Sequence, residues 1–360
     1  MRLKLAMSAT AALAAVGLLA ACSSSSTPGN DGTSGSSGGA TGGGSRPLVG
    51  VDYPRSDSDF WNAYINYVPE KADTVGVDLK TTNSQNDISK LADNVQTLVA
   101  QGVKGVVMAP QDTAAIIPTL QQLASKNIPV VSIDTRPDSG KVYMVVRADN
   151  RAYGTKACKY IGDTLGGKGN VVMFEGDLAS INGRDRTEAF NDCMKSDYPN
   201  IKVFGEPTKW DPPTAVSQLN TVLAGNTINA IYMQASIYLP STLQALQQKG
   251  LLKKRGEDGH IVIVSNDGVP AEFQAIKDGT MDATVSQPAD LYAQYGLQYV
   301  KDAIDGKKYT PGDDGHGGKI VQVSPEILED QIPAPLVTVD GKFPESVAVD
   351  DTTLWGNNVS

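Results

Sequence analysis

Cysteine and histidine are scarce in this chain, since its 360 residues include only three Cys and two His. Metal centres and catalytic sites that depend on several such side chains have few candidates, and we expect neither a metal nor a cofactor. Cations are also in the minority: 31 Lys and Arg face 40 Asp and Glu, for a net charge of −9. A broad nucleic-acid surface needs clustered Lys and Arg, so we expect no nucleic-acid partner.

Charge is absent from one long stretch near the N-terminus. Arg2 and Lys4 precede residues 5–21, which are apolar or small, the layout of a secretory signal. The stretch ends in Leu19-Ala20-Ala21-Cys22, which resembles the bacterial lipobox. We therefore expect residues 1–21 to be a lipoprotein signal peptide, and Cys22 to carry lipid that anchors the chain to the outer face of the cell membrane. An ordinary signal peptide, or an uncleaved anchor with an incidental Cys, is the alternative.

Apolar side chains are almost missing from residues 23–46, where eight Gly and eight Ser occur. Such a segment cannot offset the entropy of its ordering by burial. We expect residues 22–46, the lipidated Cys and a Gly/Ser tether, to hold a folded domain close to a membrane while leaving it free to turn.

From Leu48 onward, short apolar runs alternate with segments of helical spacing. The predicted strands cover residues 48–51, 77–81, 105–110, 129–134, 170–174, 202–204, 230–233, 261–264 and 283–285. The predicted helices cover residues 59–75, 87–101, 113–125, 151–165, 183–196, 213–224, 239–249 and 270–278. Pro69 should kink or interrupt the first of these helices. The alternation indicates an α/β fold with parallel sheets, in two successive sets that are each large enough for a lobe.

Polar and aromatic residues follow many of the predicted strands. Because ligands of open parallel sheets bind beyond the carboxyl ends of the strands, the candidate ligand-binding residues are Asp57, Ser58, Phe60, Trp61, Gln111, Asp134, Asp177, Arg186, Trp210, Asn266, Asp267 and Gln287. Asp accepts hydrogen bonds, Arg donates them, and Asn and Gln do both, so the set suits a neutral ligand with many hydroxyls. Each residue has a structural alternative, because such Asp residues often cap helices and isolated aromatics usually pack in a core.

Seven short segments carry a resemblance to a known family. They are Asn83-Ser84-Gln85-Asn86-Asp87, Asn94-Val95-Gln96, Ile133-Asp134, Ala148-Asp149-Asn150, Gly183-Arg184-Asp185-Arg186, Asn266-Asp267-Gly268 and Ala283-Thr284-Val285-Ser286-Gln287. Together they make residues 48–340 resemble periplasmic sugar-binding proteins of the ribose-binding type, the solute receptors of ABC importers. The resemblance implies two Rossmann-like lobes with parallel sheets, joined by three crossover strands. It places residues 47–148 and 288–335 in an N-terminal lobe, and residues 149–287 and 336–360 in a C-terminal lobe.

The resemblance also implies roles for single residues. Asp134 would bind hydroxyls from the first lobe, and Arg186 would clamp a ring oxygen or a hydroxyl from the second. Asp267 and Gln287 would add polar contacts. The aromatic walls would be formed by Phe60, Trp61 and Trp210. Asp57 and Ser58 would lie at the polar edge of the first wall.

Several positions depart from the pattern of ribose binders. Hydrogen-bonding side chains are replaced by Ala109, Ala148 and Ala235, while Asn266 replaces an aromatic, Trp61 enlarges a wall and Asp177 adds a carboxylate. A site that is built to pair a hydroxyl rejects a ligand that leaves the pairing unmade. We therefore expect another pentose or hexose, or a small acyclic sugar alcohol, which a monomeric chain would deliver to ABC permease subunits.

Three other functions compete with transport. An enzyme could pair Asp134 with Asp267, or Glu175 with Asp177, as glycosidase carboxylates, but we find no G-x-S-x-G, Walker or H-E-x-x-H motif and predict no enzyme. A repressor with this fold would carry a basic helix-turn-helix where the signal and tether stand. The third is a receptor that presents sugar to a membrane signalling sensor. The sequence does not distinguish such a receptor from a component of an importer.

The remaining cysteines, Cys158 and Cys193, fall on consecutive predicted helices. In an exported chain such a pair indicates a disulfide, and buried free thiols are the alternative. We expect His260 and His316, which lie in segments rich in Gly and Asp, to face solvent. Residues 312–318, with Asp313 and Asp314, could bind calcium, but their spacing matches no EF-hand loop, so we assign them to a loop.

Overall fold

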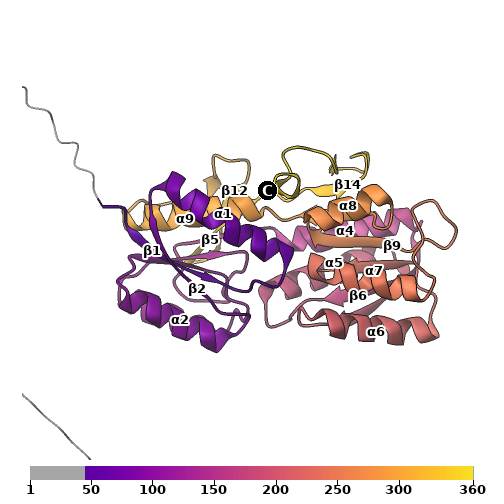
Figure 1. Ribbon diagram of the computed structural model, residues 1–360, viewed down its shortest axis with the longest axis horizontal. Helices are drawn as coiled ribbons and strands as arrows, with labels where there is room; N and C mark the ends of the chain where they lie inside the picture. Colours follow the sequence, from indigo (N-terminus) through magenta and orange to yellow (C-terminus); the bar gives the residue numbers. More distant parts are fainter. Residues whose placement is uncertain (1–44, 360) are drawn as a thin grey trace, which may run out of the picture. The chain divides into compact units, whose positions relative to one another are not determined.

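Two α/β lobes make up the part of the chain that the computed structural model describes, residues 45–359 (Figure 1). The predictions on the signal peptide and on Cys22 concern residues outside that range, as do those on nearly all of the tether. Each lobe is built around one sheet whose strands are mostly parallel, so the predicted fold class is confirmed. Within residues 45–359, no helix is both long enough and apolar enough to cross a membrane.

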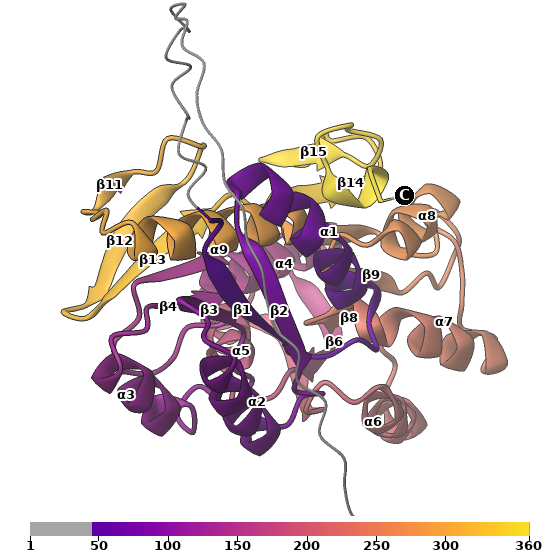
Figure 2. The ribbon, with the colours of Figure 1, turned by 60° about the vertical axis from the view of Figure 1, so that its left-hand side comes forward.

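The first lobe combines the beginning of the described chain with a later segment. Its elements are β1 (Leu48–Tyr53), α1 (Asp59–Val75), β2 (Asp78–Asn83), α2 (Ile88–Ala100), β3 (Gly105–Met108), α3 (Ile117–Ser125), β4 (Val130–Ile133), β5 (Met144–Ala148), α9 (Ala289–Ile304), β11 (Gly312–Asp313), β12 (Lys319–Ser324) and β13 (Ile327–Ile332). The sheet order is β11-β12-β13-β5-β4-β3-β1-β2, and only β12 pairs antiparallel, with both of its neighbours. The helices α1 and α9 cover one face of the sheet, and α2 and α3 cover the other (Figure 2).

The second lobe has the same layered design. Its elements are α4 (Asn150–Thr164), β6 (Lys168–Glu175), α5 (Ile181–Asp197), β7 (Asn200–Pro207), α6 (Pro212–Gly225), β8 (Ala230–Met233), α7 (Leu239–Gln248), β9 (Val262–Asp267), α8 (Pro270–Asp278), β10 (Ala283–Ser286), β14 (Leu336–Thr338) and β15 (Ser346–Ala348). The sheet order is β15-β14-β10-β9-β8-β6-β7, with only β14 and β10 antiparallel. One face packs against α4 and α5, and the other against α6, α7 and α8.

Within residues 45–359 the chain passes between the lobes three times, after β5, after β10 and after β13. Short connections of this kind let two rigid lobes rotate against each other while the core of each lobe stays intact. The carboxyl ends of the parallel strands therefore decide what the two lobes present to each other.

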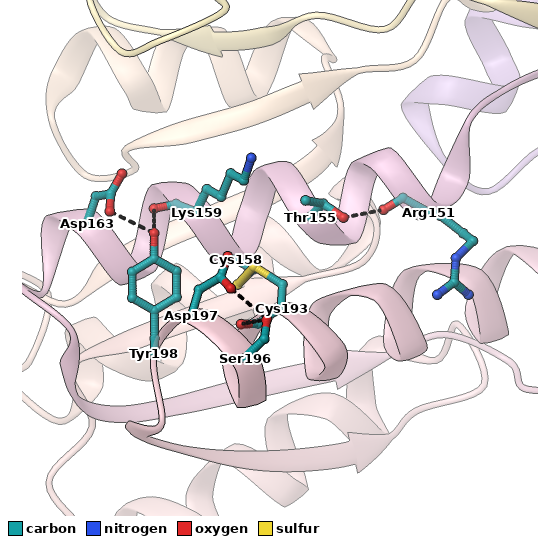
Figure 3. Close-up of a disulfide and its surroundings, with 9 residues drawn as sticks. All are labelled: Arg151, Thr155, Cys158, Lys159, Asp163, Cys193, Ser196, Asp197 and Tyr198. Carbon is teal, nitrogen blue, oxygen red and sulfur yellow. Dashed lines mark hydrogen bonds between the residues drawn. A yellow bond between two sulfur atoms is a disulfide. The ribbon is translucent and has the colours of Figure 1, made fainter.

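A disulfide between Cys158 of α4 and Cys193 of α5 joins two helices of the second lobe, with Cα atoms 6.2 Å apart (Figure 3). The two helices pack closely around Gly154, because a Cβ there would lie 2.4 Å from the carbonyl oxygen of Arg186. Only glycine permits this approach, which places α5 and its side chains at a set distance from α4.

Three local predictions are wrong. The helix α1 is not interrupted at Pro69, because burial of its apolar face against α9 outweighs the one backbone hydrogen bond that proline cannot donate. The kink expected as the alternative at Pro69 stays a prediction. The side chains of His260 and His316 are only 10% and 14% exposed, because each lies against buried carboxylates. The segment assigned to a loop begins with the short strand β11.

Candidate functional site

A cavity opens where the carboxyl ends of strands from the two lobes face each other. Side chains of both lobes line it, and small-molecule sites often occur at such a junction between two units. The first lobe contributes Arg55, Ser58, Phe60, Trp61, Gln111, Asp134 and Thr135. The second lobe and the crossover after β10 contribute Ser180, Asn182, Arg186, Trp210, Ala235, Ile237, Asp267 and Gln287.

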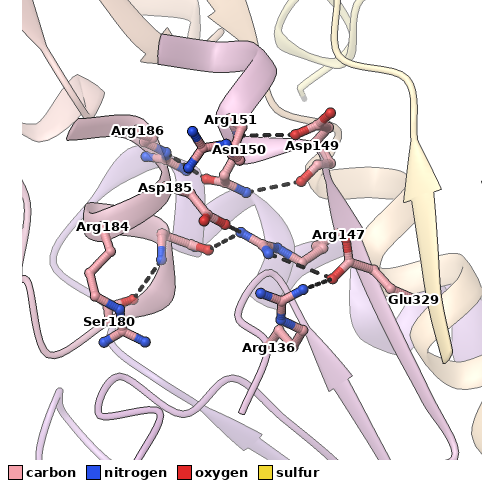
Figure 4. Close-up of polar contacts among 12 residues, drawn as sticks. Arg136, Arg147, Asp149, Asn150, Arg151, Ser180, Arg184, Asp185, Arg186 and Glu329 are labelled. Carbon is pink, nitrogen blue, oxygen red and sulfur yellow. Dashed lines mark hydrogen bonds and ion pairs between the residues drawn. The ribbon is translucent and has the colours of Figure 1, made fainter. Parts of the chain in front are cut away.

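Arg186, on α5, is the cation at the centre of the second-lobe wall, and it is almost fully buried. Its guanidinium donates to Asn150 Oδ1 at 2.6 Å (Figure 4). It also donates to Gln287 Oε1 at 2.8 Å and to the backbone carbonyl of Gln234. The aromatic rings of Tyr153 and Trp210 lie 4.9 and 5.8 Å from it. These contacts fix the planar group, so that its remaining N–H donors have a defined direction.

Asp134 follows β4 and faces Arg186 from the first lobe. Its Oδ2 accepts a hydrogen bond of 2.9 Å from Asn182 Nδ2, while its buried Oδ1 has no hydrogen-bond partner. Asn182 Oδ1 accepts in turn a hydrogen bond of 2.8 Å from Arg147 Nη2. A buried carboxylate oxygen without a donor is costly, so this oxygen is ready to accept a hydrogen bond from a hydroxyl in the cavity.

Asp267, at the end of β9, supplies a second buried carboxylate. Its Oδ2 accepts hydrogen bonds from the backbone N–H of Ser236 at 2.8 Å and from Ser236 Oγ at 2.7 Å. Its backbone carbonyl accepts from Trp355 Nε1 at 3.2 Å. The tail of the chain, around Trp355, therefore supports the cavity from behind.

Aromatic rings close two sides of the cavity. Phe60 and Trp61 come from the first turn of α1 and meet edge to face, with ring centroids 5.1 Å apart. On the opposite side, Trp210 occupies space that only a glycine at position 176 leaves open, because a Cβ on Gly176 would lie 1.9 Å from the indole ring. Such rings suit the C–H faces of a sugar or polyol, and Phe60 and Trp61 also belong to the core of the first lobe.

Three residues that line the cavity have backbone angles that L-residues rarely adopt. The φ angles of Asp134, Trp210 and Asp267 are 61°, 58° and 115°. Within the described residues only eight non-glycine positions have positive φ, and three of them meet here. Strain of this kind persists where the surrounding structure over-determines it, and it concentrates at binding sites.

Burial sets the protonation of the acidic groups. It raises the pKa of Asp134 to about 6, although the charges of Arg186 and Arg147 act in the opposite direction. Burial also raises the pKa of Asp267, again against the charge of Arg186. Behind it, burial and the nearby charge of Asp267 raise the pKa of Glu272 to about 8. Donors that bond to these carboxylates, such as ligand hydroxyls, favour their charged form.

Nine of the twelve residues named from the sequence line this one cavity: Ser58, Phe60, Trp61, Gln111, Asp134, Arg186, Trp210, Asp267 and Gln287. The other three do not. Asp57 is exposed and pairs with Arg55, Asp177 accepts a hydrogen bond from the backbone N–H of Ala179 in a turn, and Asn266 is buried inside β9. The proposed glycosidase pair of Glu175 and Asp177 also lies outside the lining.

Five further residues line the cavity that were not predicted from the sequence: Arg55, Thr135, Ser180, Asn182 and Ile237. Arg55 and Thr135 follow β1 and β4, so the strand-end rule could have found them. Ser180 and Asn182 stand at the start of α5, where Ser180 caps the helix. Ser180 and Asn182 line the cavity because the first lobe lies opposite them, and a local sequence pattern cannot predict that arrangement.

The fold and the site define the class as a two-lobed binding protein with its cavity between the lobes. Comparison with known proteins points to the particular family, because residues 49–308 match a family model described as a periplasmic binding protein domain. The ribose import binding protein RbsB of Escherichia coli (strain K12) is 26% identical over 240 residues, which cover 66% of this chain and 78% of that protein. The xylitol-binding protein of Mycolicibacterium smegmatis is 27% identical over 261 residues, covering 71% of this chain and 70% of that protein.

A solved structure supports the same fold. The solute-binding protein from Burkholderia graminis, in complex with D-arabinose, has a TM-score of 0.72 at 19% identity, covering 84% of this chain and 99% of that one. The chain thus belongs to the family of periplasmic sugar-binding proteins of the ribose type.

Proposed function

We propose that this chain is an extracytoplasmic solute-binding lipoprotein that captures a monosaccharide or a small sugar alcohol between its lobes and delivers it to an ABC importer. The observation that carries the proposal is the convergence of Asp134 from one lobe with Arg186 and Asp267 from the other on a single cavity. The relatives named for ribose and xylitol support a polyhydroxylated ligand.

Hydroxyl groups match the hydrogen-bonding needs of the cavity. A hydroxyl donates to an acceptor such as Asp134 Oδ1 and accepts from donors such as the Arg186 guanidinium. Carboxylates and guanidinium groups are both present in the lining, so a neutral ligand satisfies both kinds of partner. Charge-assisted hydrogen bonds of this type are the stronger kind, which favours selective binding.

The second-lobe wall favours a ligand other than ribose. Of the three alanines that depart from the ribose-binder pattern, only Ala235 lines the cavity, and Ile237 lies in the lining with it. Ala109 and Ala148 are buried in the cores of the lobes. The apolar pair suits C–H groups, so we expect a pentose or hexose with a different hydroxyl pattern, or an acyclic polyol.

Binding would act through lobe closure. The residues of the cavity come from both lobes, so a ligand completes its contacts only when the lobes are together, and it shifts the population toward the closed form. The crossovers after β5, β10 and β13 would absorb the rotation. The closed form would then be the one that the permease recognises.

Titration calorimetry against a panel of pentoses, hexoses and polyols tests the ligand class. We expect one ligand per chain, with affinity lost in Arg186→Ala and kept in Asp258→Asn, which changes an exposed loop carboxylate. Silence across the panel would refute the proposal. Uptake of the identified ligand by cells that lack the protein separates import from signalling, because a sensor receptor leaves uptake unchanged.

The anchor has its own test. Labelled fatty acid should be incorporated into the full-length protein and not into Cys22→Ser, whose product should be released from the membrane fraction. Retention of label in Cys22→Ser would contradict the lipoprotein proposal without affecting the proposed ligand.

A further inference from the structure

A second group of polar side chains lies at the edge of the first-lobe sheet. Asp314 and His316 belong to the connection between β11 and β12, and Asp330 lies within β13. One ligand atom from each, a ring nitrogen and two carboxylate oxygens, lies within 4.8 Å of the others. The sequence separates Asp330 from the other two, so only the pairing of β12 with β13 brings them together.

The spacing of these atoms is close to that of a metal coordination sphere. His316 Nε2 lies 2.9 Å from Asp330 Oδ2 and 3.1 Å from Asp314 Oδ2. A tetrahedral ion with bonds of about 2.0 Å holds its ligand atoms about 3.3 Å apart. The two distances from His316 Nε2 to the carboxylate oxygens therefore need to change little for an ion to bind between these atoms.

The cluster also carries unbalanced charge and unsatisfied oxygens. Both carboxylate side chains are fully buried, Asp330 Oδ1 has no hydrogen-bond partner, and Asp314 Oδ2 has none beyond the 3.1 Å contact with His316 Nε2. Among residues 45–359, no Lys or Arg forms an ion pair with either carboxylate. Two buried carboxylates with orphan oxygens are costly, and a divalent cation between them offsets that cost.

Neighbouring groups hold the three side chains in place. Asp314 Oδ1 accepts from the backbone N–H groups of His316 and Gly318, at 2.8 and 2.9 Å. Tyr299 of α9 donates to Asp330 Oδ2 at 3.0 Å, and the ring of Tyr295 stacks on His316 with centroids 3.6 Å apart. Such outer contacts orient ligands and raise the affinity of a metal site.

We propose that Asp314, His316 and Asp330 form a binding site for a divalent transition-metal ion of the zinc type, with water completing the coordination. The mixed set of one imidazole and two carboxylates suits zinc better than calcium or magnesium, which prefer oxygen ligands alone. The ion ties the β11–β12 hairpin to β13 and, through Tyr295 and Tyr299, to α9. It is a structural site, at the outer edge of the sheet and outside the lining of the ligand cavity.

Zinc titration of the full-length protein, purified without a histidine tag and stripped with a chelator, tests the site. We expect one Zn²⁺ per chain and a higher thermal midpoint in its presence, because the ion binds only the folded form. His316→Ala and Asp330→Asn should each weaken binding about 100-fold or more, and Tyr299→Phe about 10-fold. His260→Ala is the matched control, because it removes the other histidine that lies against a buried carboxylate, Asp282.

Three results would overturn the proposal: no stoichiometric Zn²⁺ binding by the folded protein, equal Zn²⁺ affinity in His316→Ala, or tighter binding of Ca²⁺ or Mg²⁺ than of Zn²⁺. Circular dichroism checks that each variant is folded. If Asp330→Asn does not fold, Asp314→Asn replaces it, since its Oδ1 can still accept the two backbone hydrogen bonds.

Discussion

At the scale of the residue, Asp134 combines the function in binding that we propose for it with a cost in stability. Its pKa of about 6 in the folded chain compares with about 3.9 for an unperturbed Asp. Below pH 4 the group is protonated in both the folded and unfolded states, so it contributes nothing. Above pH 6 it is ionised in both, and the folded state then carries a cost of at most about 3 kcal/mol.

Replacing Asp134 by Asn should therefore raise stability and lower affinity together. At pH 7 the thermal midpoint of the ligand-free variant should exceed that of the wild type, and the difference should shrink as the pH falls through 6 toward 4. Ligand affinity should fall about 10- to 100-fold, since a charged acceptor is lost. Calorimetric melts and titrations across this pH range measure both effects. A variant that is less stable than the wild type at pH 7 would contradict this account.

The alternation of side chains along a strand explains why neighbouring candidates had different outcomes. Asn266 and Asp267 are adjacent, yet only Asp267 reaches the cavity, because successive side chains in β9 point to opposite faces. Asn266 instead donates to Tyr232 of the neighbouring strand β8. The sequence could identify the strand end, but the register of its last residues needed the sheet.

At the scale of the element, the short helical turn of residues 355–357 acts on the site from the C-terminal tail. Trp355 is buried against Phe60, with ring centroids 6.0 Å apart, and its indole N–H holds the carbonyl of Asp267. That carbonyl belongs to a residue with φ of 115°, a conformation that needs support.

We predict that Trp355→Phe weakens ligand binding about 3- to 10-fold, because it removes one hydrogen bond of about 1 kcal/mol and keeps an aromatic ring. Titration calorimetry measures the loss. Gly268→Ala, which places a Cβ against Ser286 at a position with φ of 77°, should give a larger loss from the same part of the site. Full affinity in Trp355→Phe would show that the tail does not position Asp267.

The disulfide between α4 and α5 should act on stability without acting on binding. It closes a loop of 35 residues, for which chain entropy predicts about 3–4 kcal/mol of stabilisation. The double variant Cys158→Ala/Cys193→Ala should unfold at lower denaturant and bind ligand as the wild type does. Stability that does not change in the variant would favour the alternative of two free thiols.

Most helices and strands could be predicted because their apolar spacing is strong, as in α1, whose expected and observed limits agree. The elements without a prediction are β5, α9 and the β11–β13 segment, among others. The strand β13 has Glu329 and Asp330 buried in its centre. A hydrophobic pattern cannot predict a buried strand that contains such charged residues. Their burial depends on partners such as Arg147 and His316, which are distant in sequence.

At the scale of the whole molecule, the two lobes also hold each other through contacts outside the cavity. Arg184 of α5 reaches Asp138 Oδ1 at 2.5 Å and Thr113 Oγ1 at 3.1 Å, both in the first lobe. Arg147 of β5 reaches Asp185 Oδ2 of α5 at 3.1 Å. In the closure mechanism that we propose, these contacts favour the closed form before a ligand contributes anything, so they set how much of the binding free energy is spent on closure.

Breaking the contact of Arg184 with Asp138 should shift the ligand-free protein toward the open form and leave the cavity unchanged. The two side chains are 30% and 36% exposed, so we expect an effect of at most about 1 kcal/mol, or about 5-fold in apparent affinity. Asp138→Asn should also increase the radius of gyration of the ligand-free protein in X-ray scattering, and ligand should restore the wild-type value. The matched control is Arg151→Gln, which breaks exposed ion pairs with Glu188 and Asp192 within the second lobe alone. Equal losses of affinity in Asp138→Asn and Arg151→Gln would mean that surface charge in general, and not lobe closure, governs binding.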